Sequence, residues 1–394
     1  MTNDVRSKST DPACQEMLRA CEKSGLETAW DRLEKQQPQC GFGELGICCR
    51  NCNMGPCRID PFGEGASAGV CGATADIIVA RNLLRSIAAG AAAHSDHGRD
   101  VAHAFQLIVE GKAPSYGIKD QEKLDRLMKE YGVDSPALLA AAILAEFGKQ
   151  DGPIQFTRRV PPQRLELWKK LGIDPRGVDR EIVECMHRTH IGVDNDYVNL
   201  ILHGLRTSIS DGWGGSMIAT ELQDVIFGTP QPIFSEANMG VLEPEKVNII
   251  IHGHEPLLSE MIIAAASDPE MIALARNEGA EGINLAGICC TANEALMRQG
   301  VPVAGNFLSQ ELVIATGAVE AMVVDVQCIM PALGTMAGCF HTKLISTSPK
   351  AKFPGATHME FHEDTAGETA REIVRTAVKN FRNRDRSRVQ IPDI

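Results

Sequence analysis

The 394-residue chain has few aromatic residues, no excess of basic charge and no long apolar run. Aromatic residues make up 5% of it, so its core must be built from aliphatic and small side chains. The formal net charge of −12 argues against nucleic-acid binding, which needs a basic face. No apolar run reaches the roughly 18 residues of a membrane-spanning helix, and the polar start MTNDVRSKSTD lacks the apolar region of a signal peptide. These absences predict a cytoplasmic protein with no nucleic-acid partner and no membrane span.

Cysteine, in contrast, is abundant. The chain has 13 cysteines, and in a chain without a leader they indicate metal and redox ligands rather than a disulfide framework. Six of them follow the spacing C-x7-C-C-x2-C-x4-C-x13-C. Thiolates this close in sequence can converge on one metal centre without a large fold to bring them together. The six are Cys40, Cys48, Cys49, Cys52, Cys57 and Cys71.

The cysteine run favours iron–sulfur over zinc, although its C-x2-C step is also a zinc spacing. No histidine lies inside the run, and its loops are rich in glycine. Such loops let backbone N–H groups approach the sulfides of a cluster. Zinc remains the alternative at this point.

Six thiols are too many for one cubane, which takes four ligands. A plausible set of four is Cys49, Cys52, Cys57 and Cys71. Cys48 cannot easily serve the same cluster as its neighbour Cys49, because consecutive side chains usually diverge. Cys40 and Cys48 therefore form a half-site that a second copy of the chain would complete across a two-fold axis. This predicts a homodimer with a shared cluster.

The chain is expected to be an α/β protein of two parts. Residues 1–230 read as a helical, iron–sulfur cluster-binding domain that includes a long helix over 73–110. In residues 231–394, apolar β-rich runs alternate with helical patterns, which predicts a Rossmann-like domain with a parallel sheet. The expected strands are 247–252, 282–285, 301–304, 321–326, 343–347 and 358–361.

Potential metal ligands follow several of these expected strands. His252 and His254 end the first strand, Cys289 and Cys290 follow the second, and Cys328 follows the fourth. Each alone would more often be a packed core residue. Because parallel strands end at one edge of the sheet, the side chains are expected to converge on a mixed His/Cys site for iron or nickel.

Three histidines lie on the expected long helix. His94 and His97 are three residues apart on one helix face, and His103 follows. They are either polar surface residues or members of a proton relay, since imidazole titrates near neutral pH. The small apolar residues before them suggest a buried helix and favour the relay.

Other features have structural interpretations. Cys14 and Cys21 are seven apart on one helix face, and buried thiols are expected there and at Cys185 and Cys339. The GWGGS segment at 212–216 lacks the Lys-Ser/Thr of a nucleotide P-loop, so a tight turn is expected.

Together these residues resemble the nickel–iron carbon monoxide dehydrogenases of anaerobic microbes. The resemblance covers essentially the whole chain. It rests on the cysteine run and on the segments MGPCRI, GVCGA, AHSDHGRD, DREIVECMHRTH, DGWGGSMI, HGHEPLLSE, GICCTANE and DVQCIMP.

The resemblance implies a role for each candidate residue. Cys40 and Cys48 would bind a [4Fe–4S] or similar cluster shared across the dimer, and the other four cysteines of the run an intrasubunit [4Fe–4S] cluster. His254, Cys290 and Cys328 would bind a nickel–iron–sulfur active-site cluster, with Cys289 as a neighbour and second choice. His94 would act as the acid/base residue, with His97 and His103 continuing a proton path. Where some relatives have a further histidine, this chain has Asp100.

The implied reaction is CO + H2O ⇌ CO2 + 2 H+ + 2 e−. The implied partners are a second copy of the chain, a ferredoxin-like electron acceptor and a nickel-insertion accessory protein.

Members of this family are longer than this chain. Their second Rossmann-like domain would supply further cysteine ligands, including those that hold nickel, whereas here no cysteine follows Cys339. The chain is therefore expected to be a C-terminally truncated fragment, with a truncated paralogue as the alternative. Two function classes follow: a carbon monoxide dehydrogenase completed elsewhere, or a non-catalytic iron–sulfur electron-transfer module. A zinc-stabilised structural protein is a third, poorly supported class.

Overall fold

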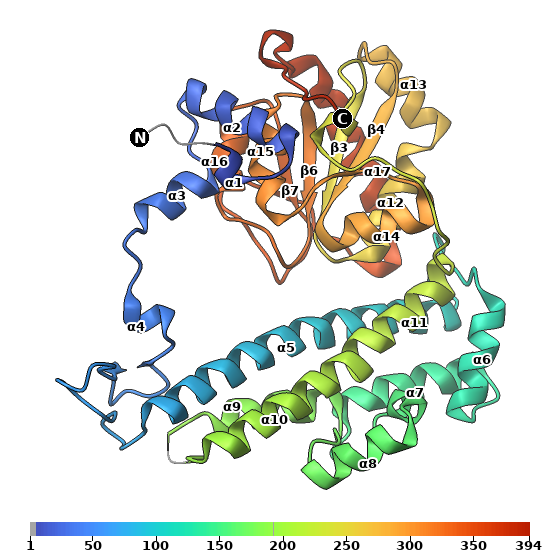
Figure 1. The fold of residues 1–394 in the computed structure, drawn as a ribbon. Helices are drawn as coiled ribbons and strands as arrows, with labels where there is room; N and C mark the ends of the chain where they lie inside the picture. Colours follow the sequence, from blue (N-terminus) through green and yellow to red (C-terminus); the bar gives the residue numbers. More distant parts are fainter. Residues whose placement is uncertain (1–4, 192) are drawn as a thin grey trace. The chain divides into compact units, whose positions relative to one another are not determined.

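The computed structural model describes residues 5–191 and 193–394, which form two compact units (Figure 1). The sheet unit contains 5–36, 112–118 and 227–394. The helical unit contains the described residues of 37–111 and 119–226. In the described part of the chain, no helix is both long enough and apolar enough to cross a membrane.

The sheet unit is built on six parallel strands, as expected of a Rossmann-like domain. Their order is β5-β4-β3-β6-β7-β8, so the chain moves outward from β3 on one side and then returns to its other side. Strand β3 has the expected bounds, while β6 begins and ends two residues earlier than expected. The strands are β3 (Val247–His252), β4 (Ile283–Ile288), β5 (Val303–Gly305), β6 (Val319–Val324), β7 (Lys343–Ser346) and β8 (Thr357–His358).

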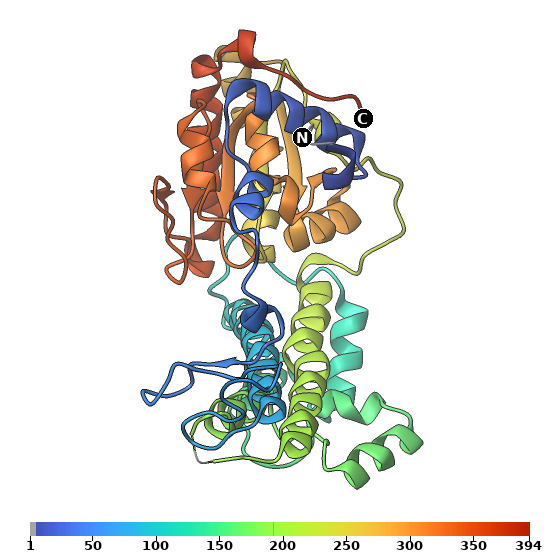
Figure 2. The same ribbon diagram turned by 60° about the vertical axis from the view of Figure 1, so that its left-hand side comes forward.

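Helices cover both faces of this sheet (Figure 2). Helices α12 (Pro256–Ala266), α13 (Pro269–Asn277) and α17 (Ala366–Asn380) pack together on one face. Helices α2 (Pro12–Ser24), α15 (Gln310–Ala315) and α16 (Leu333–Gly338) share a hydrophobic core with the other. The remaining elements of the unit are α1 (Val5–Lys8), α3 (Ala29–Lys35), α14 (Cys289–Gln299), η3 (Met239–Val241), η4 (Phe307–Ser309), η5 (Glu363–Thr365), η6 (Phe381–Asn383) and η7 (Arg386–Arg388).

The N-terminal helices belong to the sheet unit, which differs from the expected single boundary at residue 230. Helix α2 begins where the side chain of Asp11 accepts a hydrogen bond from Ala13 N, at 3.0 Å. Its apolar side chains Cys14, Met17 and Cys21 are buried in the core of the sheet. Burial of this apolar stripe is the physical reason for the difference. It also confirms the two buried thiols.

The helical unit is organised around α5 (Ala75–Val109), which fulfils the expected long helix. Helices α7, α9 and α10 pack against it. The unit comprises α4 (Gly41–Glu44), β1 (Cys48–Cys49), β2 (Cys57–Arg58), α5, α6 (Gln121–Tyr131), α7 (Pro136–Gly148), η1 (Gln155–Arg159), α8 (Pro162–Leu171), α9 (Val178–Arg188), α10 (Tyr197–Ser210), η2 (Asp211–Gly215) and α11 (Ser216–Phe227).

The GWGGS segment does not form the expected tight turn. Residues 212–215 lie in η2, a π-helical turn that continues α10 directly into α11, and Ser216 begins α11. Gly215 packs against α5 so closely that a Cβ atom there would lie 2.8 Å from the carbonyl oxygen of His94. Glycine permits this close approach. A π-helical turn inside a helix is often found at a functional site.

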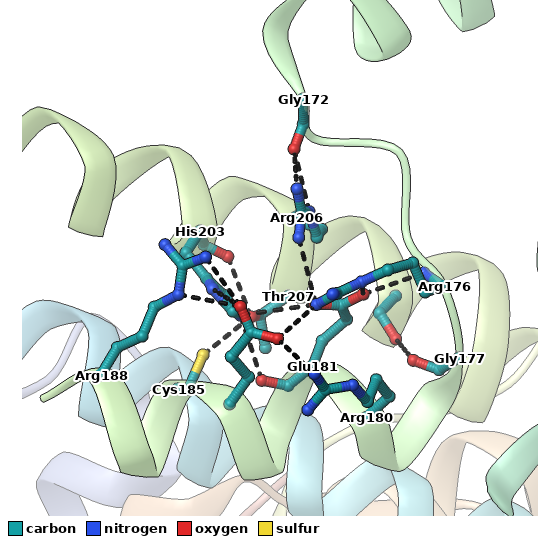
Figure 3. Close-up of polar contacts among 12 residues, drawn as sticks. Gly172, Arg176, Gly177, Arg180, Glu181, Cys185, Arg188, His203, Arg206 and Thr207 are labelled. Atoms are coloured by element: carbon teal, nitrogen blue, oxygen red, sulfur yellow. Dashed lines mark hydrogen bonds and ion pairs between the residues drawn. The ribbon is translucent and has the colours of Figure 1, made fainter. Parts of the chain in front are cut away.

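A buried ionic network joins α9 to α10 (Figure 3). The carboxylate of Glu181 is fully buried and accepts hydrogen bonds from Arg176 Nε and Nη2, at 3.1 and 2.9 Å. His203 Nε2 lies 3.4 Å from the same carboxylate. Cys185 is buried beside Thr207, as expected, with 2.8 Å between Sγ and Oγ1. Cys339 is exposed, contrary to expectation, because it follows the short helix α16 at the surface.

We expect Met17→Ala to lower the unfolding free energy of the sheet unit by about 2–5 kcal/mol, because it leaves a cavity in a closed core. Arg19→Ala on the exposed side of the same helix should change it by less than about 0.5 kcal/mol. Chemical denaturation measures both. Equal effects of the two variants would contradict the assignment of α2 to the sheet core.

The stability of the helical unit should depend on His203 in acid. Burial, aided by Arg188, lowers the pKa of His203 to about 4. The unfolded chain takes up this proton near pH 6.5, so stability is complete above about pH 6.5 and is lost as the pH falls toward 4. His203→Gln should flatten this part of the stability profile. His187→Gln, at an exposed position on α9, should leave it unchanged. Thermal unfolding between pH 4 and 7 distinguishes the two.

Candidate metal centres

The N-terminal cysteine run forms a loop held against the start of α5. Strands β1 and β2 pair antiparallel and set Cys49 opposite Cys57. The side-chain amide of Asn82 donates to the carbonyl oxygens of Gly46 and Cys48, at 2.9 and 2.8 Å. This anchors the loop to a rigid helix, which is how a short, glycine-rich segment can present several thiols in a defined arrangement.

Four of the six cysteines line one cavity in this loop. They are the four proposed from the sequence as a single set: Cys49, Cys52, Cys57 and Cys71. Neither Cys40 nor Cys48 lines it, and Cys40 is exposed at the start of α4. The other lining residues are Asn51, Met54, Gly55, Gly69, Val70, Ala73, Ile78, Arg81 and Ile191.

The cavity wall carries hydrogen-bond donors that suit an electron-rich group. Val70 N donates to Cys57 Sγ at 3.4 Å. Asn51 Nδ2 and Arg81 Nε are buried without a hydrogen-bond acceptor, and the whole Arg81 residue is only 1% exposed. The N–H of Ala73 lowers the pKa of the Cys71 thiol, and Arg81 lowers it further. The inorganic sulfides of an iron–sulfur cluster accept hydrogen bonds, which a bare zinc ion cannot do. Four thiols together with two unsatisfied N–H donors therefore fit an iron–sulfur cluster better than zinc.

The second candidate centre lies at the carboxyl ends of three adjacent strands in the sheet unit. His252, the last residue of β3, pairs in register with Ile288 of β4 on one side and Val324 of β6 on the other. The expected ligands come within four residues of these positions: His254 after β3, Cys289 and Cys290 after β4, and Cys328 after β6. The boundary between β3 and β6 is the topological switch point, where sheets of this kind bind their ligands.

A buried carboxylate ties the β3 and β6 ends together. Asp325 accepts hydrogen bonds from His254 N at 2.7 Å and from Glu255 N at 3.0 Å. A side chain at Gly253 would collide with Asp325, because a Cβ atom there would lie 1.8 Å from Oδ1. Burial raises the pKa of Asp325 to about 6, against the effect of these N–H groups. The carboxylate thus fixes the backbone that carries His254.

The three thiols of this centre act on one another electrostatically. Burial raises the pKa of Cys289 to about 12, with contributions from Cys328 and Cys290. Burial also raises the pKa of Cys290, followed by the effect of Cys328. Cys289 and Cys328 have positive φ angles of 66° and 56°, and so does Gln327, at 64°. Such backbone conformations cost about 1–3 kcal/mol each and cluster at functional sites.

Three soft thiols with an imidazole make a donor set that suits iron or nickel. Among residues 5–191 and 193–394, however, no three or more His, Cys, Asp or Glu side chains are arranged around a position for a single metal ion. The ligands of a metal–sulfur cluster bind different metal atoms of one cage, so they need not surround one point. The donor set therefore fits a cluster better than a lone ion.

The histidines of α5 lie in the helical unit. His94 Nδ1 is 2.8 Å from Asp211 Oδ1 at the start of the π-helical turn. This hydrogen bond raises the pKa of His94, while burial opposes it. His97 Nε2 receives a hydrogen bond of 2.7 Å from Gln223 Nε2. His103 is exposed.

Several supporting residues were not identified from the sequence, among them Asp211, Gln310 and Asp325. Asp325 lies three residues before Cys328 and Asp211 directly precedes GWGGS, so both stood within recognised motifs. Gln310, whose amide hydrogen-bonds the loop that carries Cys328, has no such signal, because its partners in that loop are 18 and 20 residues away in the sequence.

The fold and these donor sets define a Rossmann-like protein with cysteine-rich metal-ligand sets. Residues 47–394 match the model of the Prismane/CO dehydrogenase family. The chain is 70% identical to carbon monoxide dehydrogenase 1 of Methanosarcina mazei. The match covers 100% of this chain and 64% of that protein. It is 51% identical to carbon monoxide dehydrogenase 1 of Carboxydothermus hydrogenoformans, with 98% of this chain matching 62% of that one.

A nickel-free crystal structure of carbon monoxide dehydrogenase from Thermococcus sp. AM4 superposes with a TM-score of 0.97 at 54% identity. The match covers 99% of this chain and 64% of that one. The chain therefore belongs to the Prismane/CO dehydrogenase family. It spans less than two thirds of the length of these relatives.

We expect Asp211→Asn to lower the pKa of His94, because the neutral amide no longer stabilises the protonated imidazole. Titration of the His94 ring protons by NMR measures the change. Asp134→Asn, at an exposed loop position, should not alter it. An unchanged pKa in Asp211→Asn would show that the carboxylate does not control this histidine.

Proposed function

We propose that this chain is part of an anaerobic carbon monoxide dehydrogenase, which interconverts CO and water with CO2, two protons and two electrons. The main evidence is that one imidazole and three thiols lie at the carboxyl ends of three adjacent parallel strands. Two relatives that bear the name carbon monoxide dehydrogenase support the same activity at 70% and 51% identity.

His254, Cys290 and Cys328 are the proposed ligands of a nickel–iron–sulfur cluster, and Cys289 is the neighbouring thiol. When bound, this cluster would supply the site at which CO is oxidised. The protein's own part is to present these ligands from rigid strand ends. Asp325 contributes by holding the backbone of His254 in place.

The four cysteines of the loop cavity are proposed to bind an intrasubunit [4Fe–4S] cluster. Its role would be to carry electrons onward to a ferredoxin-like acceptor. The two buried donors of the cavity, on Asn51 and Arg81, would reach the cluster's sulfides and thereby influence its potential.

Cys40 and Cys48 are proposed to bind a cluster shared with a second copy of the chain, which makes the protein a homodimer. Support comes from the surface around this loop, where large apolar side chains are exposed. An isologous interface would bury them against the same residues of the second copy. They are Leu45, Met54, Phe62 and Val70.

His94 is proposed as the acid/base residue, with His97 and His103 continuing a path for protons. Residues three apart on a helix are displaced by about 60° around the axis and about 4.5 Å along it. The three histidines therefore wind around α5 toward the exposed His103. Asp211 supports the role of His94 by raising its pKa, which favours the protonated imidazole.

A reducing, cytoplasmic setting and a nickel-insertion accessory protein complete the proposal. All 13 cysteines are free, which suits thiols that must remain available to metals. The nickel-free Thermococcus enzyme was produced without its CooC maturase. The absence of nickel from that enzyme supports the proposal that this chain, too, needs an accessory protein to receive nickel.

A non-catalytic iron–sulfur electron-transfer module is the second candidate. It is favoured by the cysteine cavity of the helical unit, which is a complete set of four thiols without any ligand from the sheet unit. Such a module would hold iron but no nickel.

The deciding experiment is the nickel and iron content per chain after anaerobic expression with nickel. We expect nickel together with at least about six irons, from one [4Fe–4S] cluster and half of a shared one. Cys328→Ser should lose nickel and keep the iron of the N-terminal loop. Cys339→Ser, at an exposed thiol that is not a proposed ligand, should lose neither.

Electron transfer from CO to an artificial acceptor then tests the activity of nickel-containing samples. Iron without nickel in the unaltered chain would mean an electron-transfer module or an enzyme fragment that lacks nickel ligands, and either result would overturn the proposal that this chain alone oxidises CO.

A further inference from the structure

The side chain of Gln310 is buried directly behind the strand-end site. It is the first residue of α15 and is 0% exposed. Its Oε1 accepts a hydrogen bond from Met330 N at 2.9 Å and lies 3.1 Å from His252 Nε2. Its Nε2 donates to the carbonyl oxygens of Phe307 at 2.6 Å and Cys328 at 3.2 Å. All four hydrogen-bonding positions of the amide are thus used.

These contacts join three segments that are far apart in sequence. One partner is the end of β3, one is the turn η4, and two belong to the loop after β6. Within that loop the amide binds on both sides of Ile329, at the carbonyl of Cys328 and the N–H of Met330. The loop is therefore fixed at the residue that carries the candidate thiol ligand and just beyond it.

The held segment has an unusual backbone. Gln327 and Cys328 are consecutive non-glycine residues with positive φ angles. Conformations of this kind persist only where surrounding contacts enforce them. Asp325 fixes the start of the loop through its bonds to His254 N and Glu255 N. Gln310 supplies the corresponding restraint at the far side.

We propose that Gln310 is a positioning residue that fixes the backbone of Cys328, so that its thiolate is presented to the metal cluster together with His254. Its link to His252 couples this restraint to the strand from which His254 follows. The proposal deepens the proposed function and rests on it. Gln310 itself does not bind metal; it acts through the loop of Cys328.

Gln310→Met tests the proposal because methionine has a similar length but makes none of the four hydrogen bonds. The matched control is Gln155→Met, which replaces a buried glutamine of the helical unit that donates to Glu130 O at 2.7 Å. Nickel retention is measured by dialysis of each loaded chain against increasing chelator, well below its unfolding temperature. Hydrogen exchange of residues 327–330 is measured on the same variants without metal.

We expect Gln310→Met to weaken nickel retention about 10- to 100-fold, the usual effect of losing a residue that orients a ligand. The EPR signal of the N-terminal clusters should remain, and the amide of Met330 should exchange faster even without metal. Gln155→Met should match the unaltered chain in every measurement.

Unchanged nickel retention and unchanged exchange in Gln310→Met would overturn the proposal, as would equal effects of Gln155→Met. If the unaltered chain holds no nickel, the proposed activity of this chain alone fails, independently of Gln310. The exchange measurement then still decides whether Gln310 fixes the Cys328 loop, since it requires no metal. If the amide of Met330 exchanges as slowly in Gln310→Met as in the unaltered chain, the positioning role is rejected even without nickel.

Discussion

Burial of both faces of the parallel sheet is the constraint on which the rest of the sheet unit depends. Every residue of β3 and of β6 is buried, so neither face of these strands can be left to water. Helices α12, α13 and α17 cover one face. On the other face α15 and α16 are short, and α2 from the start of the chain completes the cover. Because both faces are closed, the strand ends are where this sheet can expose reactive side chains.

The position of the candidate ligands directly after the strand ends forces a strained backbone on two of them. Short connections leave β4 and β6 abruptly, and Cys289 and Cys328 adopt left-handed backbone conformations there. Buried side-chain hydrogen bonds restrain the strained segment that carries Cys328: Asp325 accepts hydrogen bonds from His254 N and Glu255 N, and Gln310 binds the loop on both sides of Ile329. These two residues do no metal chemistry themselves. They stabilise the backbone conformation of Cys328.

The sequence pattern predicted the features that depend on neighbouring residues. It did not predict the features that depend on contacts between residues far apart in the sequence. Strand β3 and the long helix α5 follow from apolar runs and small residues, and the set of four loop cysteines follows from spacing alone. The packing of α2 against the sheet could not be predicted, because an apolar helix face shows that the helix is buried but not which core it is buried in. The π-helical turn at Asp211 reads as a glycine-rich turn until the close packing of Gly215 on α5 is seen. Gln310 gave no signal, since its partners span residues 252 to 330.

Both candidate centres contain buried polar atoms without hydrogen-bond partners, but the side chains that support each centre differ. In the helical unit, Asn51 and Arg81 keep buried N–H groups without acceptors, each of which costs free energy until an acceptor arrives. A cluster bound there would satisfy those donors and stabilise the unit, so metal loading and folding reinforce each other. At the strand ends, Asp325 and the amide of Gln310 are bonded within the protein, whereas His252 Nδ1 and Thr291 Oγ1 are buried without a hydrogen-bond partner. The backbone of the loop that carries Cys328 is therefore restrained by the fold before any metal binds, while polar atoms next to it remain unsatisfied, as in the loop cavity.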